Sequence, residues 1–167
     1  MEKLTLFLVL LIVSCNHSNS NPDDKVNFFN TPYSDFKNIS FLKDYEKISD
    51  TSFSKAGYDP THRITELQKN DKKLILFSKI ELDSNRREIY SVLDTLQINR
   101  LTQDQVLTIG YCEVENSLME EIIAIFYRTD PRQRKIYRIH KAWKANAESN
   151  KIEPIRNSEV KFCWDVD

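Results

Sequence analysis

The side chains of this chain that could do acid–base chemistry are few and widely separated. The three histidines are His17, His62 and His140. His62 lies near Asp59 and Glu66 in the sequence, and a histidine beside a carboxylate is the minimum that general acid–base catalysis requires. Nothing beside these residues marks a nucleophile or an oxyanion hole. The sequence therefore predicts no catalytic residue and no enzyme, and a hydrolase that uses His62 or His140 is the least favoured function.

The spacing of glycine, cysteine and histidine excludes the common cofactor and metal motifs. Gly57 and Gly110 are the only glycines, whereas the dinucleotide fingerprint, the P-loop and the G-x-S-x-G turn each need several within one short window. No C-x-x-C or H-x-x-x-H spacing occurs, although zinc sites are built from such pairs. We therefore expect neither a cofactor nor a bound metal.

One local concentration of positive charge lies between residues 128 and 144, where many basic residues accompany a single acidic one. If this segment is a strand, alternation places Arg138, His140 and Lys144 on one face. The opposite face would then carry Tyr137, Ile139 and Trp143. The basic face could bind a carboxylate, a phosphate or an acidic protein partner. The alternative is a solvated sheet face whose charge is balanced by glutamates of the neighbouring strand.

Composition favours one globular domain without a global electrostatic partner. The chain has 167 residues, of which 40% are hydrophobic, and this suffices for the core of one domain. Its 24 basic and 25 acidic residues give a net charge of −1. A chain so close to neutral has no overall field that would gather nucleic acid. We therefore expect no nucleic-acid partner.

The N-terminus has the pattern of an export signal. Lys3 precedes a run, residues 4–13, in which only Thr5 is polar. A helix of this length covers about half of the ~20 residues that a membrane span requires. The run is therefore typical of a signal-peptide core rather than a permanent span.

Ile12, Val13, Ser14 and Cys15 end this run with an aliphatic, a β-branched and a small residue before a cysteine. The motif resembles the lipobox of bacterial lipoprotein precursors. The resemblance implies that residues 1–14 are a signal peptide and that the thiol of Cys15 receives a diacylglycerol. The rest of the chain resembles small uncharacterised exported lipoproteins, with no functional motif to transfer. The alternative is a plain secretory peptide with an incidental cysteine.

Lipidation of Cys15 would attach the protein to a membrane of the cell envelope. Two or more acyl chains give stable anchoring, whereas one gives only reversible binding. The residues that follow Cys15 are polar as far as Lys25, so we expect 15–25 to form a lipidated, flexible tether. Residues 26–167 would form a single strand-rich domain that stands off the lipid surface.

The expected secondary structure is a short N-terminal helix followed by strands. Between Ser34 and residue 48, apolar residues recur every third position, namely Phe36, Ile39, Leu42, Tyr45 and Ile48. This spacing favours one face of a short helix with Ser34 as its N-cap. Strands are expected over 63–68, 73–82, 88–98, 106–114, 119–128, 135–145, 152–155 and 160–164.

The connections between these strands are short and rich in asparagine and aspartate, which adopt turn conformations that glycine usually supplies. Connections this short join only antiparallel neighbours. Residues 122–127 are β-branched or aromatic and predict a central strand buried on both faces. The expected fold is therefore α+β, a predominantly antiparallel meander with a short N-terminal helix.

With Cys15 assigned to lipid, Cys112 and Cys163 remain. In an oxidising compartment they could form a disulfide if the last strand pairs beside residues 106–114. A bridge across about 50 residues would stabilise the fold by ~4 kcal/mol in the chain-entropy description. The alternative is two separate, half-buried thiols that behave as small apolar side chains.

The sequence thus favours a lipid-anchored protein of the cell envelope with a binding or structural role. Its partners would be the membrane, through the anchor, and a second protein. The alternative is an inhibitor or immunity-type module that blocks an envelope enzyme or toxin, which predicts an exposed aromatic patch with complementary charge. A hydrolase would instead require a deep pocket that contains a histidine and a carboxylate.

Overall fold

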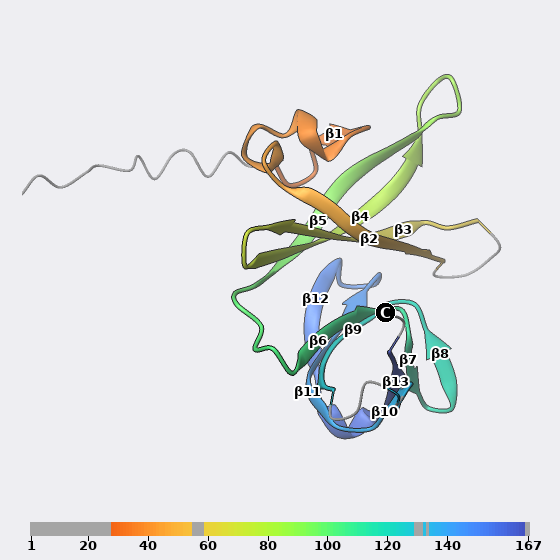
Figure 1. The fold of residues 1–167 in the computed structure, drawn as a ribbon. Helices are drawn as coiled ribbons and strands as arrows, with labels where there is room; N and C mark the ends of the chain where they lie inside the picture. Colours follow the sequence, from red (N-terminus) through yellow and green to blue (C-terminus); the bar gives the residue numbers. More distant parts are fainter. Residues whose placement is uncertain (1–27, 55–58, 129–131, 133, 166–167) are drawn as a thin grey trace, which may run out of the picture.

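Three antiparallel sheets make up the domain in the computed structural model, which describes residues 28–54, 59–128, 132 and 134–165. A five-stranded sheet, here called the N-terminal sheet, lies beside a small barrel made of two four-stranded sheets (Figure 1). None of the helices within the described residues is long and apolar enough to span a membrane.

The N-terminal sheet is a meander of four long strands with a short strand at one edge. Its strands are β1 (Pro32–Tyr33), β2 (Glu46–Phe53), β3 (His62–Lys69), β4 (Lys72–Leu82) and β5 (Glu88–Ile98). Their order across the sheet is β1-β5-β4-β3-β2, and every neighbouring pair is antiparallel. The predicted meander of antiparallel strands is therefore confirmed for this half of the domain.

The predicted N-terminal helix is wrong, and with it the α+β class. Over the predicted range the chain forms two 3₁₀ turns, η2 (Phe36–Asn38) and η3 (Ser40–Leu42), before β2 begins. The cap is Asp35, whose side chain accepts the Lys37 amide at 2.9 Å, rather than Ser34. An apolar side chain at every third position matches the 3.0-residue period of a 3₁₀ helix better than the 3.6 of an α-helix. The fold is predominantly antiparallel β.

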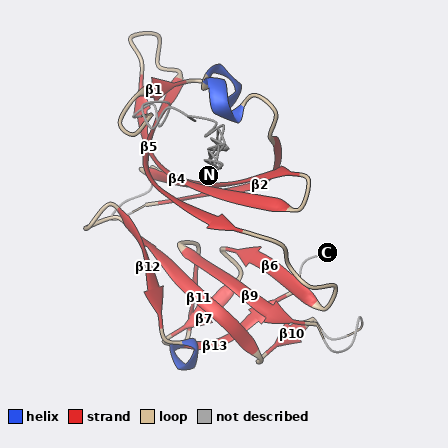
Figure 2. Cartoon of the chain, turned by 90° about the vertical axis from the view of Figure 1, so that its left-hand side faces the viewer, coloured by secondary structure: helices blue, strands red, loops and turns tan. Residues whose placement is uncertain are grey.

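The barrel is formed by the remaining strands, and the chain passes repeatedly between its two sheets. They are β6 (Gln105–Ile109), β7 (Cys112–Val114), β8 (Ser117–Met119), β9 (Ile122–Tyr127), β10 (Lys135–Ile136), β11 (Ile139–Asn146), β12 (Lys151–Ile155) and β13 (Val160–Trp164), with the 3₁₀ turn η4 (Asn157–Glu159) before β13. One sheet has the order β12-β11-β9-β6 (Figure 2), and the other has the order β10-β13-β7-β8. The last strand, β13, pairs with both β7 and β10 and so lies in the interior of its sheet.

Gly110 divides the strand that was predicted over 106–114. Its φ of +80° lies in the left-handed region, which glycine adopts without steric cost. A side-chain carbon at this position would lie 3.3 Å from the carbonyl oxygen of Glu120. The chain therefore bends at Gly110, and β6 and β7 belong to different sheets of the barrel.

In three hairpin turns, asparagine occupies a position with positive φ, which glycine usually occupies. Asn70, Asn116 and Asn150 have φ values of 54°, 65° and 58°. Each lies in a connection between neighbouring antiparallel strands. The prediction that these asparagines supply the turns of a glycine-poor chain is confirmed.

Two hydrophobic clusters lie on opposite sides of β9. The inter-sheet cluster packs the N-terminal sheet against the barrel; its buried members are Phe53, Ile64, Ile75, Phe77, Ile98, Ile109, Ile123, Ile125 and Ala145. The barrel cluster fills the interior; its buried members are Cys112, Val114, Ile122, Ala124, Phe126, Ile136, Ala142, Val160 and Cys163. Alternate residues of β9 enter each cluster. Residues 122–127 therefore form a central strand buried on both faces, as predicted.

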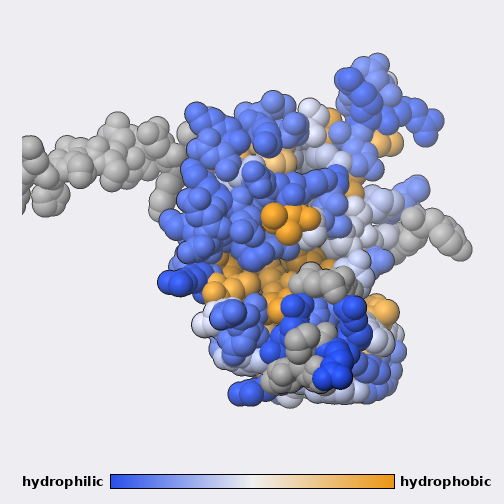
Figure 3. All heavy atoms as spheres, in the orientation of Figure 1, coloured by the Kyte–Doolittle hydropathy of each residue, from blue (hydrophilic) through white to orange (hydrophobic). Residues whose placement is uncertain are grey.

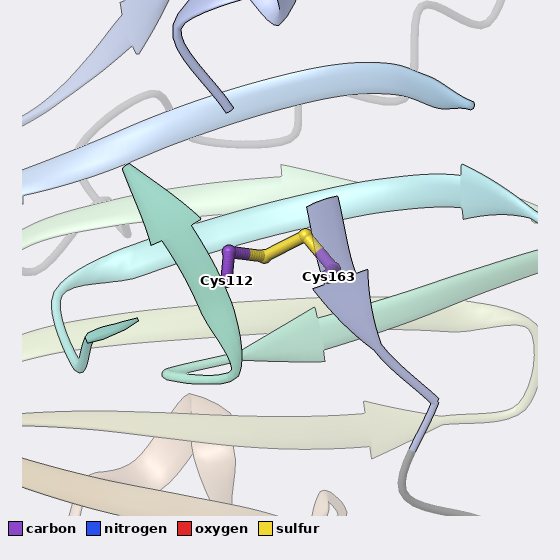
Figure 4. Close-up of a disulfide and its surroundings, with 2 residues drawn as sticks. All are labelled: Cys112 and Cys163. Atoms are coloured by element: carbon purple, nitrogen blue, oxygen red, sulfur yellow. A yellow bond between two sulfur atoms is a disulfide. The ribbon is translucent and has the colours of Figure 1, made fainter. Parts of the chain in front are cut away.

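Cys112 and Cys163 are joined by a disulfide inside the barrel (Figure 4). The two residues lie directly opposite one another in the β7–β13 ladder, and both are 0% exposed. The bridge therefore joins two neighbouring strands of one sheet, β7 and β13.

Candidate functional site

Arg138 and His140 of the predicted basic face converge on one aromatic ring, that of Tyr127. The Arg138 guanidinium lies 4.8 Å from the centroid of this ring. The His140 ring meets it edge-on at 5.1 Å, with His140 Nδ1 3.3 Å from the Tyr127 hydroxyl oxygen. The three side chains form a cation–aromatic stack on the barrel.

Lys144 does not share this face, so the predicted alternation is wrong. The β9–β11 register shifts between Ile139 and Lys141, which makes His140 the extra residue of a β-bulge. Beyond the bulge, Lys144 pairs with Ile122 and lies 3.5 Å from a carboxylate oxygen of Glu121. One inserted residue reverses the faces of all residues that follow it in the strand.

The same bulge separates the side chains that were predicted on the opposite face. Ile139 packs against the barrel cluster, whereas Trp143 packs against the inter-sheet cluster. Tyr137, before β11, is 60% exposed.

His140 lines a cavity of about 300 Å³ between the β5–β6 connection and β11. The cavity also contains Arg100, Lys141 and Trp143. Among the described residues that line it there is no aspartate or glutamate. This arrangement provides no carboxylate to act with His140, so it does not favour the hydrolase.

His62 belongs to the hydrophobic core. It is 8% exposed, and its ring centroid lies 5.5 Å from those of both Phe53 and Phe77. Its Nδ1 atom is 2.9 Å from the Thr61 hydroxyl oxygen. Its sequence neighbour Glu66 instead contacts Lys73 and Ser49. The structure therefore gives His62 a packing environment between aromatic rings.

An aromatic patch on the outer face of the barrel was missed by sequence reasoning. Lys135, Tyr137, Phe162 and Trp164 form this patch. The Phe162 ring lies between those of Tyr137 and Trp164, with centroid distances of 5.7 and 5.6 Å. The Lys135 ammonium lies 3.7 Å from the Phe162 centroid and 5.4 Å from that of Trp164. The pairing of β10 with β13 brings together residues that are far apart in the sequence.

The exposure of the patch differs between its centre and its rim. Phe162 is only 3% exposed, whereas Tyr137 and Trp164 are 60% and 36% exposed. The ammonium group of Lys135 lies within the patch, and the chain from 132 to 144 contains no acidic residue. A buried aromatic centre with an aromatic and cationic rim is the composition found at protein–protein interaction sites.

A second polar cavity lies between the N-terminal segment and the sheet that it covers. It measures about 330 Å³ and is lined by Tyr33, Arg63 and Tyr90 among others. The Tyr33 hydroxyl is 3.0 Å from that of Ser78, and Arg63 donates to the Tyr90 hydroxyl. Burial raises the pKa of the Tyr33 phenol above its ordinary value of 10.0, and the Ser78 hydrogen bond and the charge of Arg63 offset part of this shift.

Tyr33→Phe is expected to weaken the loss of stability at alkaline pH. The pKa of the Tyr33 phenol is higher in the folded state, so the protonated phenol contributes its full stabilisation below pH 10.0. This contribution is lost as the pH rises through the pKa of the folded state, because the unfolded state releases its proton first. At neutral pH, loss of the Ser78 hydrogen bond is expected to cost about 1 kcal/mol. Urea unfolding at neutral pH and above pH ~10 measures both effects.

Tyr111→Phe removes an exposed phenol and is the matched control. Equal alkaline slopes for wild type and Tyr33→Phe would contradict the prediction.

No protein-family model, no curated protein and no solved structure matches this chain. Cys15 and the lipobox lie outside the described residues. The described residues also hold no cluster of three or more histidine, cysteine or acidic side chains that could bind a metal ion. Among the surfaces formed by the described residues, the aromatic patch has the composition of a binding site.

Proposed function

We propose that this protein is a lipid-anchored lipoprotein of the bacterial cell envelope whose domain binds another protein through the aromatic patch. The anchor is Cys15, and the polar segment that follows it holds the domain off the membrane. The work of the protein is recognition rather than catalysis.

Export is supported by the disulfide between Cys112 and Cys163. Disulfides persist in oxidising compartments outside the cytoplasm and are rare within it. This bridge is fully buried in the barrel, so it belongs to the folded core rather than to an exposed redox pair. The lipobox resemblance and the buried bridge therefore point to the same side of the membrane.

Protein binding is supported by the aromatic patch, which is the observation that carries the proposal. Tryptophan and tyrosine contribute disproportionately to the binding energy of protein interfaces. Tyr137 and Trp164 are the accessible members, and both flank the buried ring of Phe162. The partner that fits has apolar contacts for the rings of Tyr137 and Trp164 and a polar or acidic group near the Lys135 ammonium.

An inhibitor or immunity-type module is the second candidate. It requires an exposed aromatic patch with nearby charge, and Lys135 beside Phe162 and Trp164 meets this description. The two candidates differ in the partner, which for the inhibitor is an envelope enzyme or a toxin that loses activity when bound.

The double variant Tyr137→Ala/Trp164→Ala is expected to weaken partner binding by at least about 30-fold, because the loss of a single hot-spot contribution of about 2 kcal/mol already has this effect. The domain is immobilised and exposed to envelope extract, and a protein retained by wild type is identified and titrated by calorimetry. Leu82→Ala, which removes a 58% exposed side chain from β4, is the control.

Three outcomes separate the candidates. Loss of binding in the double variant but not in Leu82→Ala supports the patch. Inhibition of the captured protein's activity by the domain favours the inhibitor. Equal binding by both variants would contradict the proposal.

A further inference from the structure

Five of the six sheet edges formed by the described residues carry features that prevent further strand pairing. β1 is two residues long and contains Pro32, and β8 and β10 are three and two residues long. β2 is charged and has a register shift after Lys47. β12 contains Pro154, and its Ile152 amide donates to Asp94 of β5 at 2.8 Å. Short length, charge, bulges and proline are the usual means of protecting an edge.

β6 lacks all of these features. Its five residues, Gln105–Ile109, include no charged side chain and no proline. Its ladder with β9 has no register shift. Among the described residues, no second strand pairs with β6, which ends the β12-β11-β9-β6 sheet. Such an edge is a template for another strand.

The hydrogen-bond pattern of β6 directs specific backbone groups toward the open edge. Gly110 donates to the Ile122 carbonyl at 2.9 Å, and the Asp104 carbonyl accepts the Arg128 amide at 2.8 Å. In an antiparallel ladder, residues alternate between bonding to the partner and pointing away from it. The even-numbered residues of β6 therefore bond to β9, and the N–H and C=O groups of the odd-numbered Leu107 and Ile109 face outward.

A groove runs along this edge, between the barrel and the N-terminal sheet. Its volume is about 450 Å³, and all five residues of β6 line it together with residues 48–50 of β2. Hydrophobic side chains are exposed in the hollow between the two halves of the molecule (Figure 3). Ile48, which lines the groove, is 51% exposed.

The charged side chains that line this groove form ion pairs within the protein. Glu66 binds Lys73, and Arg128 binds Asp165 through two hydrogen bonds. These pairs present little net charge to an occupant. An uncharged segment with extended backbone therefore fits both the groove and the free backbone groups of β6.

We propose that an extended, uncharged segment of a partner polypeptide adds to the edge of β6 as a further strand of this sheet. The backbone of Leu107 and Ile109 supplies the hydrogen bonds, and alternate side chains of the segment enter the groove beside Ile48. This surface is distinct from the aromatic patch, and the inference does not depend on the function proposed for that patch.

The test is site-specific photo-crosslinking of the full chain in cells that naturally make it, with benzoylphenylalanine at position 48. The backgrounds are wild type, Leu107→Pro and Leu107→Ala. Both substitutions remove the leucine side chain, but only proline removes the N–H that faces the open edge. Leu107→Pro is expected to reduce the crosslinked product about tenfold relative to Leu107→Ala.

The second measurement uses the unsubstituted chain and does not depend on the folding of the proline variant. Residue-resolved hydrogen exchange is compared between the isolated protein and its complex with the crosslinked partner. The amides of Leu107 and Ile109 are expected to become protected in the complex, whereas those of Val106 and Thr108 are protected in both states.

The proposal is supported if the crosslink maps to an extended, uncharged segment of another protein and depends on the Leu107 amide. It is overturned by the absence of a crosslink at position 48, by equal crosslinking in the proline and alanine variants, or by unchanged exchange at Leu107 and Ile109. A crosslink between two copies of this chain would replace the partner with a dimer and also overturns it.

Discussion

Cys15→Ala is expected to release the protein from membranes. Without the thiol there is no site for the diacylglycerol that is proposed to hold the protein at the membrane. Membrane fractionation and metabolic labelling with palmitate measure the effect. The wild type is expected to sediment with membranes and to carry the palmitate label. The variant is expected to remain in the supernatant without label.

Ser14→Ala is the matched control for this prediction. It keeps a small residue directly before Cys15, so lipid addition and membrane association are expected to persist. A Cys15→Ala variant that still sediments with membranes, together with a wild type that takes up no palmitate, would show that the anchor is not this cysteine.

Loss of the disulfide is expected to lower the free energy of unfolding by about 4 kcal/mol, the chain-entropy value for a loop of this size. The bridge joins residues separated by 51 positions, so its removal frees almost the whole barrel sequence in the unfolded state. Both sulfurs also fill space in the barrel cluster. The double variant Cys112→Ala/Cys163→Ala tests this by urea denaturation of the chain that lacks the anchor.

Chemical reduction of the wild type distinguishes the cross-link from the packing of the sulfurs. Reduction opens the loop but keeps both sulfur atoms, so it is expected to cause most of the loss seen in the double variant. If reduced and oxidised wild type unfold at the same urea concentration, the bridge does not stabilise this fold.

Local patterns in the sequence determined the strands and the turns between them. The β-branched run at 122–127 forms a strand buried on both faces because neither side carries a polar residue that would require solvent. The asparagines at 70, 116 and 150 turn the chain because this residue tolerates positive φ. Both the strand and the turns follow from residues that are adjacent in the sequence, so the sequence is enough to predict them.

The predicted helix failed because its local pattern fits two kinds of helix. A three-residue apolar repeat is close to the periods of both the α-helix and the 3₁₀ helix. Packing of Leu42 against the N-terminal sheet, together with the early start of β2 at Glu46, leaves room only for short turns. Contacts with a distant part of the chain decided between two similar periods.

The candidate binding surfaces depended on tertiary structure. The bulge at His140 moved Lys144 to the other face, and alternation carries no sign of where an extra residue enters a ladder. The aromatic patch required β10 to pair with β13, and the open edge required β6 to end its sheet. Periodicity along a strand shows which residues share a face, but only the contacts between strands far apart in sequence decide what lies beside that face and which edges remain open.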